Sequence, residues 1–432
     1  MSSRECDIQY GLLVTVAPLI DGPTERYNCY QIIDTGSIFK MTPYCHTINT
    51  QDTLKFERLL IIEITGQSTV TKDSHDLWQI ANFYKERIRR GLKTVISISW
   101  ITENTLSISL AYAIKELIDQ GIDPKHIILF CPENFNTLRG DFVGFFSITG
   151  EEINIICCYH AEIHAYYRSY ISQEQPLSKF SVDRPNKCLV NMAKISKHFR
   201  VMLLYEIFKG RQYDQFSVSV NTGSFVSIDD AFSKDINQIF GNLNTDAQFP
   251  SFKSCLKDNK FKEWIKLSEG RIDNFDIEEW DVDILKSTAF LGYPVDPKIF
   301  DNTCLSLVSE TWVSGNFLTE KTFKPIINSH PFIINGGAGE LKTLHSMGYK
   351  TFDFIIDESY DDIEDHELRI KEIYKQSLIF LKEYKNHLEQ LEQVVEHNRQ
   401  NHYHRGFEKF NEIRRLLIKI SRNFFNYNPS LS

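Results

Sequence analysis

The sequence predicts an α/β protein made of two Rossmann-like units, each with a parallel β-sheet, followed by long C-terminal helices. Three observations lead to this fold class. Short apolar runs alternate with helical periods in two separate stretches, glycines stand where several of these periods end, and most of 361–432 is charged and helical. The chain has 432 residues, and at roughly 100–200 residues per domain this length fits two or three domains.

The first stretch starts with residues 59–64, a nearly continuous apolar run that is typical of a parallel strand buried on both faces. Ser74 is a helix-capping residue, and apolar residues recur on one helical face from there to Gly91. Strand and helix then repeat, so the order is βαβαβ, the right-handed unit of Rossmann-like folds. The strands are expected at 59–64, 94–100 and 126–130, and the helices from Ser74 to Gly91 and from Leu106 to Gly121.

The second stretch begins near Lys187 and repeats the alternation after an interruption. Residues 225–300 break the pattern, are partly acidic, and are expected to form irregular connections with short helices. The strands are expected at 188–192, 216–220, 304–309 and 331–335, and the helices at 198–209, 319–329 and 340–347.

The alternation divides the chain into four parts. Residues 1–55 form a β-rich N-terminal extension, 56–184 and 185–360 form the two Rossmann-like domains, and 361–432 form helices that pack across both. Ligands of open α/β sheets bind outside the carboxyl ends of the strands. We therefore expect the two domains to face a cleft that holds the ligand.

Composition and charge exclude several protein classes. The chain is 42% hydrophobic and 24% charged, which is ordinary for a globular protein and excludes wholesale disorder. With 48 basic and 57 acidic residues the net charge is −9, which argues against a broad nucleic-acid surface. No apolar run approaches the roughly 18–20 residues of a membrane helix, no secretory signal is visible at the start, and the nine cysteines are irregularly spaced. These features predict a cytoplasmic protein with reduced thiols and no integral membrane contact.

The most informative segment joins a strand to a helix between Val308 and Pro325. Thr319 is a favourable N-cap, and Glu320 in the first helical turn suits the helix dipole. Lys321 opposes that dipole, at a cost of some tenths of a kcal/mol. An anionic ligand at this helix end would remove the conflict and use the backbone N–H groups, so the segment is a candidate phosphate site beside the plain explanation as a capped helix start.

A second strand-to-helix turn, from Asn335 to Glu340, contains three glycines. Gly336 and Gly337 would let backbone amides approach a phosphate or a sugar, and tight packing of the strand on the helix explains them equally well. The turn is not GxGxxG, and GxxxxGK[ST] occurs nowhere, so a P-loop nucleotidase is not expected.

Two parts of the chain resemble the donor-binding half of GT-B glycosyltransferases, above all the α-1,3-fucosyltransferase family. The first is Glu310 followed by the triplet 319–321 and a strand led by Pro331. The second is 187–204, which with Arg200 is similar to that family's strand–loop–Arg–helix element.

The resemblance covers about 187–360, and 352–361 is also similar to glycosyltransferase-like proteins of viruses and bacteria. The Ser-Asn pair that precedes the Arg in fucosyltransferases is not matched around Ala193 and Lys194. The resemblance therefore does not specify fucose as the sugar.

The resemblance implies a nucleotide-sugar site. Glu320 would accept hydrogen bonds from the ribose of the donor, and Lys321 and Arg200 would neutralise its diphosphate. Enzymes of this kind replace a metal ion with Arg, Lys and helix dipoles, which stabilise the departing diphosphate, so no metal and no cofactor besides the donor substrate is expected. Glu310 would either bind a sugar hydroxyl as a catalytic acid or brace the loop. The remaining residues expected beside the donor are Thr319, Gly336 and Gly337.

An inverting transfer also needs a general base for the acceptor hydroxyl. Glu103 is the first candidate, because it follows the strand that ends at Trp100, beside an aromatic residue that could stack on a sugar. Glu133, after the next strand, is the alternative. Either carboxylate could equally be a helix cap or a surface group.

Two further patterns could indicate a metal, and we assign a metal to neither. Asp281 and Asp283 have the DxD spacing of metal-dependent glycosyltransferases, in a stretch so acidic that such spacing arises by chance. His397, His402 and His404 have spacings that do not put three ligands on one helical face. A polar turn between helices is expected there.

We therefore expect a glycosyltransferase that moves a sugar from a nucleotide-diphosphate donor to a hydroxyl acceptor, such as a glycan, with inversion and without a metal. One alternative is transfer to hydroxymethylated bases of viral DNA, in which nucleic acid is the acceptor. Another is a non-catalytic protein of the same fold that binds a nucleotide sugar or a carbohydrate.

Overall fold

A computed structural model of the chain shows two compact units. The first comprises Met1–Tyr167 with Arg405–Ser432, and the second comprises Arg168–His404. The structure describes residues 10–16, 45–47, 60–65, 74–99, 108–131, 153–157, 159–166, 169–170, 177–192, 198–220, 254–255, 257–267, 298–310 and 318–423.

This grouping differs from the predicted domain limits in the segment before residue 185. The Arg184 guanidinium is buried and donates hydrogen bonds to the Ser329 carbonyl at 3.1 Å and to the Ser178 hydroxyl at 3.0 Å. The backbone N–H of Ser178 donates to Asn328 Oδ1 at 2.9 Å. These contacts attach 178–184 to the second unit, whereas the sequence assigned it to the first.

The end of the C-terminal helix, α16 (Leu388–Asn423), belongs to the first unit. Arg405 Nε lies 2.6 Å from Oε1 of Glu162, a buried carboxylate of helix α4 (His160–Tyr166). The rings of Tyr166 and Phe410 also meet, at 5.4 Å between centroids. This ion pair and ring contact fasten the last part of the chain to α4.

The first sheet is entirely parallel, and its strand order is β2-β1-β3-β4-β5-β6 among the described residues. The predicted N-terminal extension supplies two of its strands, with β1 between β2 and β3 and β2 at the edge. Residues 1–55 are therefore partly built into the first sheet. The strands are β1 (Tyr10–Val16), β2 (Cys45–Thr47), β3 (Leu60–Thr65), β4 (Thr94–Ser99), β5 (Ile127–Cys131) and β6 (Asn154–Cys157).

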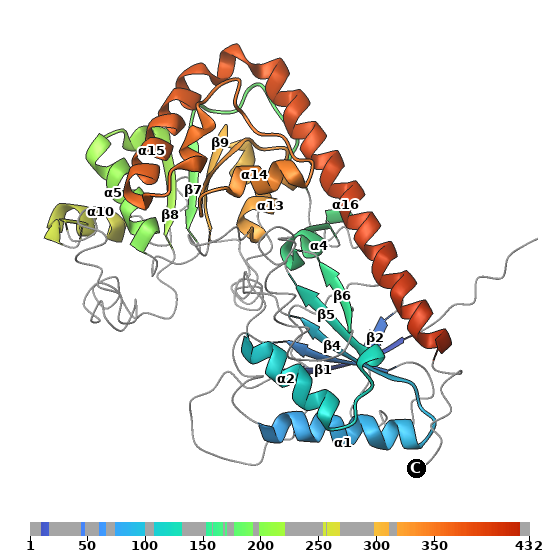
Figure 1. The fold of residues 1–432 in the computed structure, drawn as a ribbon. Helices are drawn as coiled ribbons and strands as arrows, with labels where there is room; N and C mark the ends of the chain where they lie inside the picture. The colour runs from blue at the N-terminus through green and yellow to red at the C-terminus, as the bar shows by residue number, and fades with distance from the viewer. Residues whose placement is uncertain are drawn as a thin grey trace, which may run out of the picture. The chain divides into compact units, whose positions relative to one another are not determined.

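Helices α1 (Ser74–Arg89) and α2 (Ile108–Asp119) lie side by side against these strands (Figure 1). Their apolar faces and the strands form one core, in which Ile96, Ile114 and Leu117 are among the fully buried side chains. The glycines predicted to end the helices, Gly91 and Gly121, have φ angles of +72° and +89°. Glycine adopts this left-handed backbone without the penalty that other residues incur, so the predicted ends are confirmed.

The second sheet is also parallel, with the order β10-β9-β7-β8. The chain passes from β7 to β8 on one side and then returns to place β9 on the other side of β7. The strand order therefore reverses between β7 and β9, and in open α/β sheets ligands bind at such a switch point, outside the carboxyl ends of the strands. The strands are β7 (Cys188–Met192), β8 (Phe216–Val220), β9 (Leu305–Ser309) and β10 (Phe332–Asn335).

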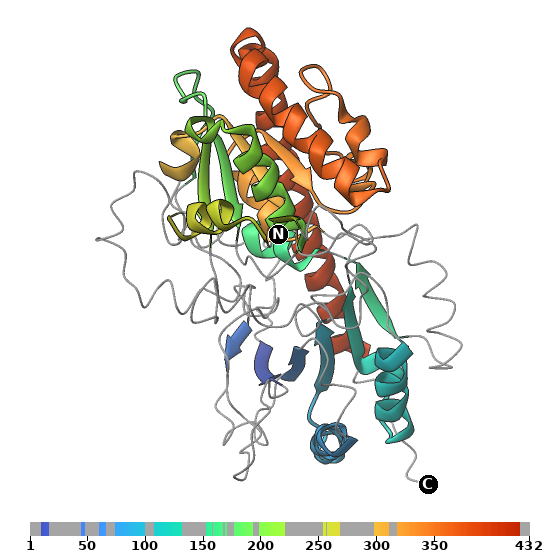
Figure 2. The same ribbon diagram turned by 90° about the vertical axis from the view of Figure 1, so that its left-hand side faces the viewer.

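Several helices accompany the second sheet. Helix α5 lies over the strands in the view of Figure 2, and its Phe199 meets His366 of α15 edge to face, with 5.7 Å between centroids. The predicted 225–300 region contributes short helices where it is described. The helices are α5 (His198–Gly210), α10 (Asn259–Leu267), α12 (Lys298–Asp301), α13 (Glu320–Ile327), α14 (Glu340–Ser346) and α15 (His366–Glu383). The 3₁₀ segments of the two units are η2 (Pro124–His126), η4 (Tyr213–Gln215), η6 (Glu358–Asp362) and η7 (Tyr384–Asn386).

The predicted fold class, two parallel α/β units with long C-terminal helices, is confirmed, but the polar turn expected at the three histidines is wrong. His397, His402 and His404 all lie inside α16, which continues for 36 residues. His402 is fully buried and its Nδ1 is 3.1 Å from the Tyr349 hydroxyl, while His397 Nε2 is 3.0 Å from the Gly348 carbonyl. Two of these polar rings thus bind the loop after α14 and do not interrupt the helix.

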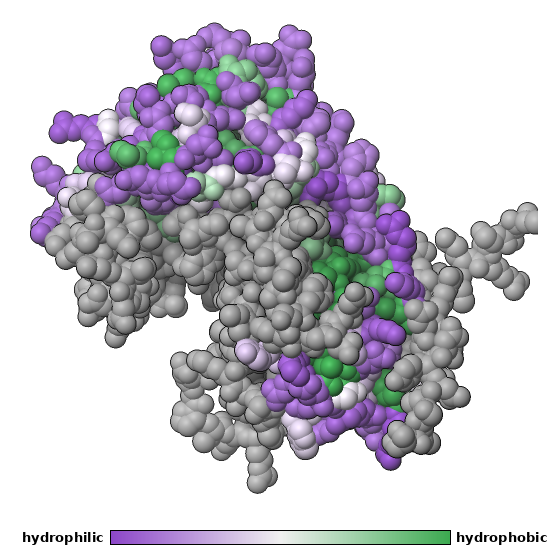
Figure 3. Space-filling model, in the orientation of Figure 1, coloured by the Kyte–Doolittle hydropathy of each residue, from purple (hydrophilic) through white to green (hydrophobic). Residues whose placement is uncertain are grey.

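The surface of the second unit that Figure 3 presents is mainly hydrophilic, with separate apolar areas. Within the described ranges, no helix combines the length and the apolar composition that crossing a membrane requires. Large apolar side chains that are exposed stand on several different helices, including Trp78, Tyr112, Leu368 and Phe407.

Replacement of Gly406 by alanine should destabilise the first unit. A Cβ at this position would lie 2.2 Å from Cγ and 2.6 Å from Cβ of Tyr166, atoms close to the main chain that cannot swing away. We expect the free energy of unfolding to fall by about 1–3 kcal/mol, as for other overpacked sites, measured by urea unfolding with circular dichroism. Glu408→Ala, at an exposed position two residues later, should change it by less than about 0.5 kcal/mol. Equal stability of the two variants would contradict the close approach of α16 to α4.

Candidate functional site

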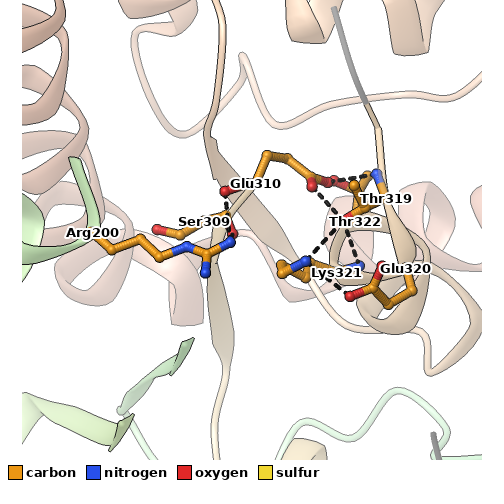
Figure 4. A network of polar contacts seen from close by, with 7 residues as sticks. All are labelled: Arg200, Ser309, Glu310, Thr319, Glu320, Lys321 and Thr322. Atoms are coloured by element: carbon orange, nitrogen blue, oxygen red, sulfur yellow. Dashed lines mark hydrogen bonds and ion pairs between the residues drawn. The ribbon is translucent and has the colours of Figure 1, made fainter. Parts of the chain in front are cut away.

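The candidate site lies at the carboxyl end of β9, at the switch point of the second sheet (Figure 4). Glu310 directly follows this strand, and Arg200 comes from the first turn of α5, the helix that follows β7. Thr319 and Lys321 stand at the start of α13, the helix that follows β9. The two crossover helices beside the switch point thus place Arg200, Thr319 and Lys321 around the end of β9 (Figure 4).

Glu310 is fully buried, and its carboxylate binds the N-terminus of α13. Its Oε1 accepts hydrogen bonds from the Thr319 backbone N–H at 3.0 Å and from the Thr322 hydroxyl at 2.6 Å. Its Oε2 accepts a further bond from the Thr319 hydroxyl. Both oxygens are therefore engaged with α13, an arrangement that suits the bracing alternative better than contact with a substrate hydroxyl.

Arg200 is buried and holds the backbone at the end of β9. Its Nη2 donates to the Glu310 carbonyl at 2.8 Å and to the Ser309 carbonyl at 3.3 Å. Burial lowers the pKa of Arg200 to about 10, against the opposing influence of Glu310 and Glu320. The guanidinium therefore stays cationic at neutral pH within a protein interior.

The start of α13 has the predicted cap. Thr319 accepts a hydrogen bond from the Lys321 backbone N–H at 3.3 Å. The Lys321 ammonium lies 2.8 Å from Glu320 Oε1 and 3.2 Å from the Thr319 hydroxyl, and the side chains of Lys321 and Glu320 are only 11% and 18% exposed. The cation that opposes the helix dipole is therefore held by a neighbouring carboxylate and by the capping hydroxyl.

Lys324, one turn further along α13, adds a third cationic side chain that the sequence analysis did not single out. Burial lowers its pKa to about 8, with Glu320 and Glu310 acting in the opposite direction. Burial opposes ionisation of Glu320, but Lys321 and Lys324 outweigh it and lower the pKa of Glu320 to about 2. Charges of both signs are thus closely coupled at this helix end.

Arg200 and Lys321 approach the end of β9 from different elements. In Figure 4, Arg200 reaches the Glu310 backbone from one side, while Lys321 lies on the other, toward Thr319 and Glu320. Glu320 connects the two electrostatically, because it bonds Lys321 and also acts on the pKa of Arg200.

The glycine-rich turn after β10 is filled by the protein's own groups. Gly337 donates its N–H to Glu340 Oε1 at 3.3 Å, and a Cβ on Gly336 would lie 3.0 Å from the Glu340 side chain. The N–H groups of Leu341 and Lys342, at the start of α14, donate to Asp361 Oδ2 at 3.0 and 3.4 Å. These contacts support the packing explanation of the glycines, and a role in donor binding stays a prediction.

Arg369 of α15 also binds the glycine-rich turn. Its guanidinium donates to the Gly336 carbonyl at 2.9 Å and lies 2.6 Å from His366 Nδ1. Neither this residue nor Thr322 was predicted. Thr322, one turn after a threonine cap, was the easier of the two to find, whereas Arg369 lies far away in the sequence and carries no local signal.

Several predicted residues lie outside the described parts of the chain. These include both candidates for the general base and both aspartates of the DxD spacing: Glu103, Glu133, Asp281 and Asp283. Among the residues that are described, no three His, Cys, Asp or Glu side chains gather as metal ligands would.

Among known proteins, the chain has matches to solved structures but none to a protein-family model or to a curated protein. An α,α-trehalose 6-phosphate synthase from Burkholderia multivorans is similar with 10% identity over 86% of this chain and 73% of that one, at a TM-score of 0.40. A UDP-forming α,α-trehalose-phosphate synthase from Burkholderia xenovorans, in complex with glucose-6-phosphate, is 11% identical over 94% and 100% of the chains, at a TM-score of 0.39. Values this low carry no conclusion about family or activity.

Thr322→Val should weaken the brace between β9 and α13. The substitution keeps the shape of the side chain but removes the hydroxyl that donates to the buried Glu310 carboxylate. We expect a loss of about 1.5–3 kcal/mol in the free energy of unfolding, the usual contribution of a hydrogen bond to a charged group. Urea unfolding of the second unit measures it. Thr322→Ser keeps the hydroxyl and should lose no more than about 1 kcal/mol, the value of one methyl group; a larger loss in this control than in Thr322→Val would contradict the brace.

Acid should reveal the ionised state of Glu320. Because its pKa of about 2 lies below the ordinary 4.5, ionised Glu320 stabilises the folded state above pH 4.5, and this contribution disappears as the pH falls from 4.5 to 2. The upper limit is about 3 kcal/mol, from 1.36 kcal/mol per pKa unit.

Glu320→Gln should therefore unfold more easily at pH 7 and lose less stability than the parent protein between pH 4.5 and 2. Thermal unfolding across this range measures both effects. Glu392→Gln, at an exposed position on α16, serves as the control and should follow the parent curve. If Glu320→Gln lost as much stability between pH 4.5 and 2 as the parent protein, Glu320 would not be held ionised in the folded state.

Proposed function

We propose that the protein is a GT-B glycosyltransferase that transfers a sugar from a nucleotide-diphosphate donor to a hydroxyl acceptor. The observation that supports the proposal is that Arg200 of α5 and the start of α13, which carries Lys321, both bond residues at the carboxyl end of β9, at the switch point of a parallel sheet. Clefts at this place bind nucleotides in open α/β folds, and the buried Arg200 and the largely buried Lys321 are cations of the kind that bind a diphosphate.

The chemistry requires such cations. In the transfer step the bond between the sugar C1 and the diphosphate oxygen breaks, and the nucleotide diphosphate leaves with the electron pair. The acceptor oxygen forms a bond to C1 and gives its proton to a general base, for which Glu103 and Glu133 are the candidates. Arg200 and Lys321 would stabilise the charge that develops on the leaving group, so the proposed mechanism is inverting and metal-independent.

Glu320 and Glu310 have different proposed roles. Glu320 is partly exposed, at the start of α13, and would accept hydrogen bonds from the ribose hydroxyls of the donor. Lys321 pairs with Glu320 in this structure. With the donor bound, the Glu320 carboxylate would bond both Lys321 and the ribose hydroxyls, and the Lys321 ammonium would turn toward the diphosphate. Glu310, whose oxygens already accept three hydrogen bonds, would position α13 and would not touch the reacting atoms.

The assignment to the α-1,3-fucosyltransferase family is the finer part of the proposal. It is supported by the sequence motif of Glu310, the triplet 319–321 and the strand led by Pro331, which in the folded chain meet around β9 and β10. The unmatched Ser-Asn pair before Arg200 leaves the sugar unspecified, so the donor has to be identified by experiment.

A panel of UDP-, GDP- and CMP-sugars tests the proposal by thermal shift, followed by calorimetry with the best donor. We expect one nucleotide class to stabilise the protein, and Lys321→Ala to bind it tenfold to a hundredfold more weakly, as the loss of one charge-assisted hydrogen bond of about 1.5–3 kcal/mol predicts. Lys342→Ala removes an exposed lysine of the neighbouring helix α14 and should bind normally. Equal binding by both variants, or no binding of any nucleotide sugar, would overturn the site.

Catalysis is tested separately, by mass spectrometry of products from an acceptor panel in the presence of EDTA. Sugar transfer that persists in EDTA and falls in Glu320→Ala and Lys321→Ala is the expected result. Complete dependence on Mn²⁺ would favour a metal site at Asp281 and Asp283 instead. Donor binding without any product would support a non-catalytic binding protein.

A further inference from the structure

The first unit contains a pair of cysteines on neighbouring strands, remote in sequence from the proposed donor site. Cys131 is the last residue of β5 and Cys157 the last residue of β6. They are directly paired in the register of the two parallel strands, and their sulfur atoms are 3.6 Å apart. Paired residues of adjacent strands project to the same face of a sheet, so both thiols point the same way.

This spacing matches what a disulfide requires. Neighbouring strands lie about 4.7–4.9 Å apart, within the range of about 4.4–6.8 Å between Cα atoms that a disulfide can bridge. The sulfur atoms would have to close from 3.6 Å to about 2.05 Å. Each cysteine is the last residue of its strand, so closing this gap would shift the strand ends and could leave the preceding pairs of the ladder in place.

Three further cysteines have side chains that the structure describes. Burial raises the pKa of Cys255 and of Cys304 to about 12 and the pKa of Cys188 well above its ordinary value. These three thiols are buried, as is Cys131, and the thiolate is the form that reacts with oxidants. Cys157 is only partly buried, so solvent reaches one member of the pair.

We propose that Cys131 and Cys157 form a reversible disulfide when the protein meets a peroxide. The Cys157 thiolate attacks one oxygen of the peroxide, so that an S–O bond forms, the O–O bond breaks and water leaves after protonation. The Cys131 thiolate then attacks the sulfenic sulfur, forms the S–S bond and expels a second water. Two thiols thus lose two electrons and two protons, and one hydrogen peroxide becomes two water molecules.

The disulfide would link the carboxyl ends of β5 and β6, two neighbouring strands of the first sheet. β6 leads into α4, the helix whose Glu162 pairs with Arg405 of α16. The cross-link would therefore fix the start of α4 relative to β5, at the edge of the first sheet.

The experiment treats the full chain with equimolar hydrogen peroxide, alkylates the remaining thiols, and maps the digested peptides by mass spectrometry. We expect the titre of nine thiols to fall by two, a cross-linked pair of peptides containing Cys131 and Cys157 with a mass lower by two hydrogens, and full recovery in dithiothreitol. The thiol titre and the peptide map are measured on the parent protein, so they do not depend on whether a variant folds.

Variants then identify the chemistry. Cys131→Ser should leave a sulfenic acid on Cys157 that dimedone captures, whereas Cys188→Ser should cross-link like the parent protein. Cys158→Ser should also retain the cross-link, because the inference assigns the bond to Cys157 and not to its neighbour. A bond between Cys157 and Cys158, or Cys131 alkylated equally before and after peroxide, would overturn the proposal. Neither result would bear on nucleotide-sugar binding, which is measured independently.

Discussion

The second unit depends on one buried carboxylate. Glu310 leaves β9 at the switch point of the sheet and binds both threonines at the start of α13, while its carbonyl receives Arg200 from α5. A buried carboxylate is strongly unfavourable unless hydrogen bonds replace its water, and here the N-terminus of a helix provides them. The same bonds determine where α13 begins, and therefore where Glu320 and Lys321 stand. The position of the candidate site and the stability of the second unit therefore depend on the same contacts.

The local signals in the sequence were sufficient for most strands and helices of the two alternating stretches and for the start of α13. Continuous apolar runs predicted β7 and β9 because a parallel strand is buried on both faces, and glycine with a positive φ ended α1. The capping role of Thr319 was predicted from its residue type alone and is found in the structure. Each of these features depends on residues within one element or its immediate flank.

What the sequence did not reveal depends on partners far away in the chain. β1 joins the interior of the first sheet through pairing with β3, about 50 residues later, and a short apolar segment gives no sign of its neighbours. The histidines of α16 suggested a polar turn, because their partners Tyr349 and Gly348 belong to another element. Asp361, in the separate 3₁₀ segment η6, accepts a hydrogen bond from the backbone N–H of Leu341 at the start of α14. The sequence of the glycine-rich turn alone gives no sign that this N–H group already has a partner.

The same distinction changes the meaning of Lys321. From sequence, an external anion was one way to offset the unfavourable position of a cation in the first turn of a helix, but Glu320 and Thr319 already hold its ammonium. The helix dipole alone therefore does not demand a phosphate. The stronger reason for an anionic ligand is the concentration of cationic side chains in a poorly hydrated place, with burial lowering the pKa of Arg200 to about 10 and that of Lys324 to about 8. A diphosphate beside these cations would offset the cost of their desolvation. Glu320 already compensates part of that cost. On binding, the phosphate oxygens would therefore replace the Glu320 carboxylate as partners of the cations.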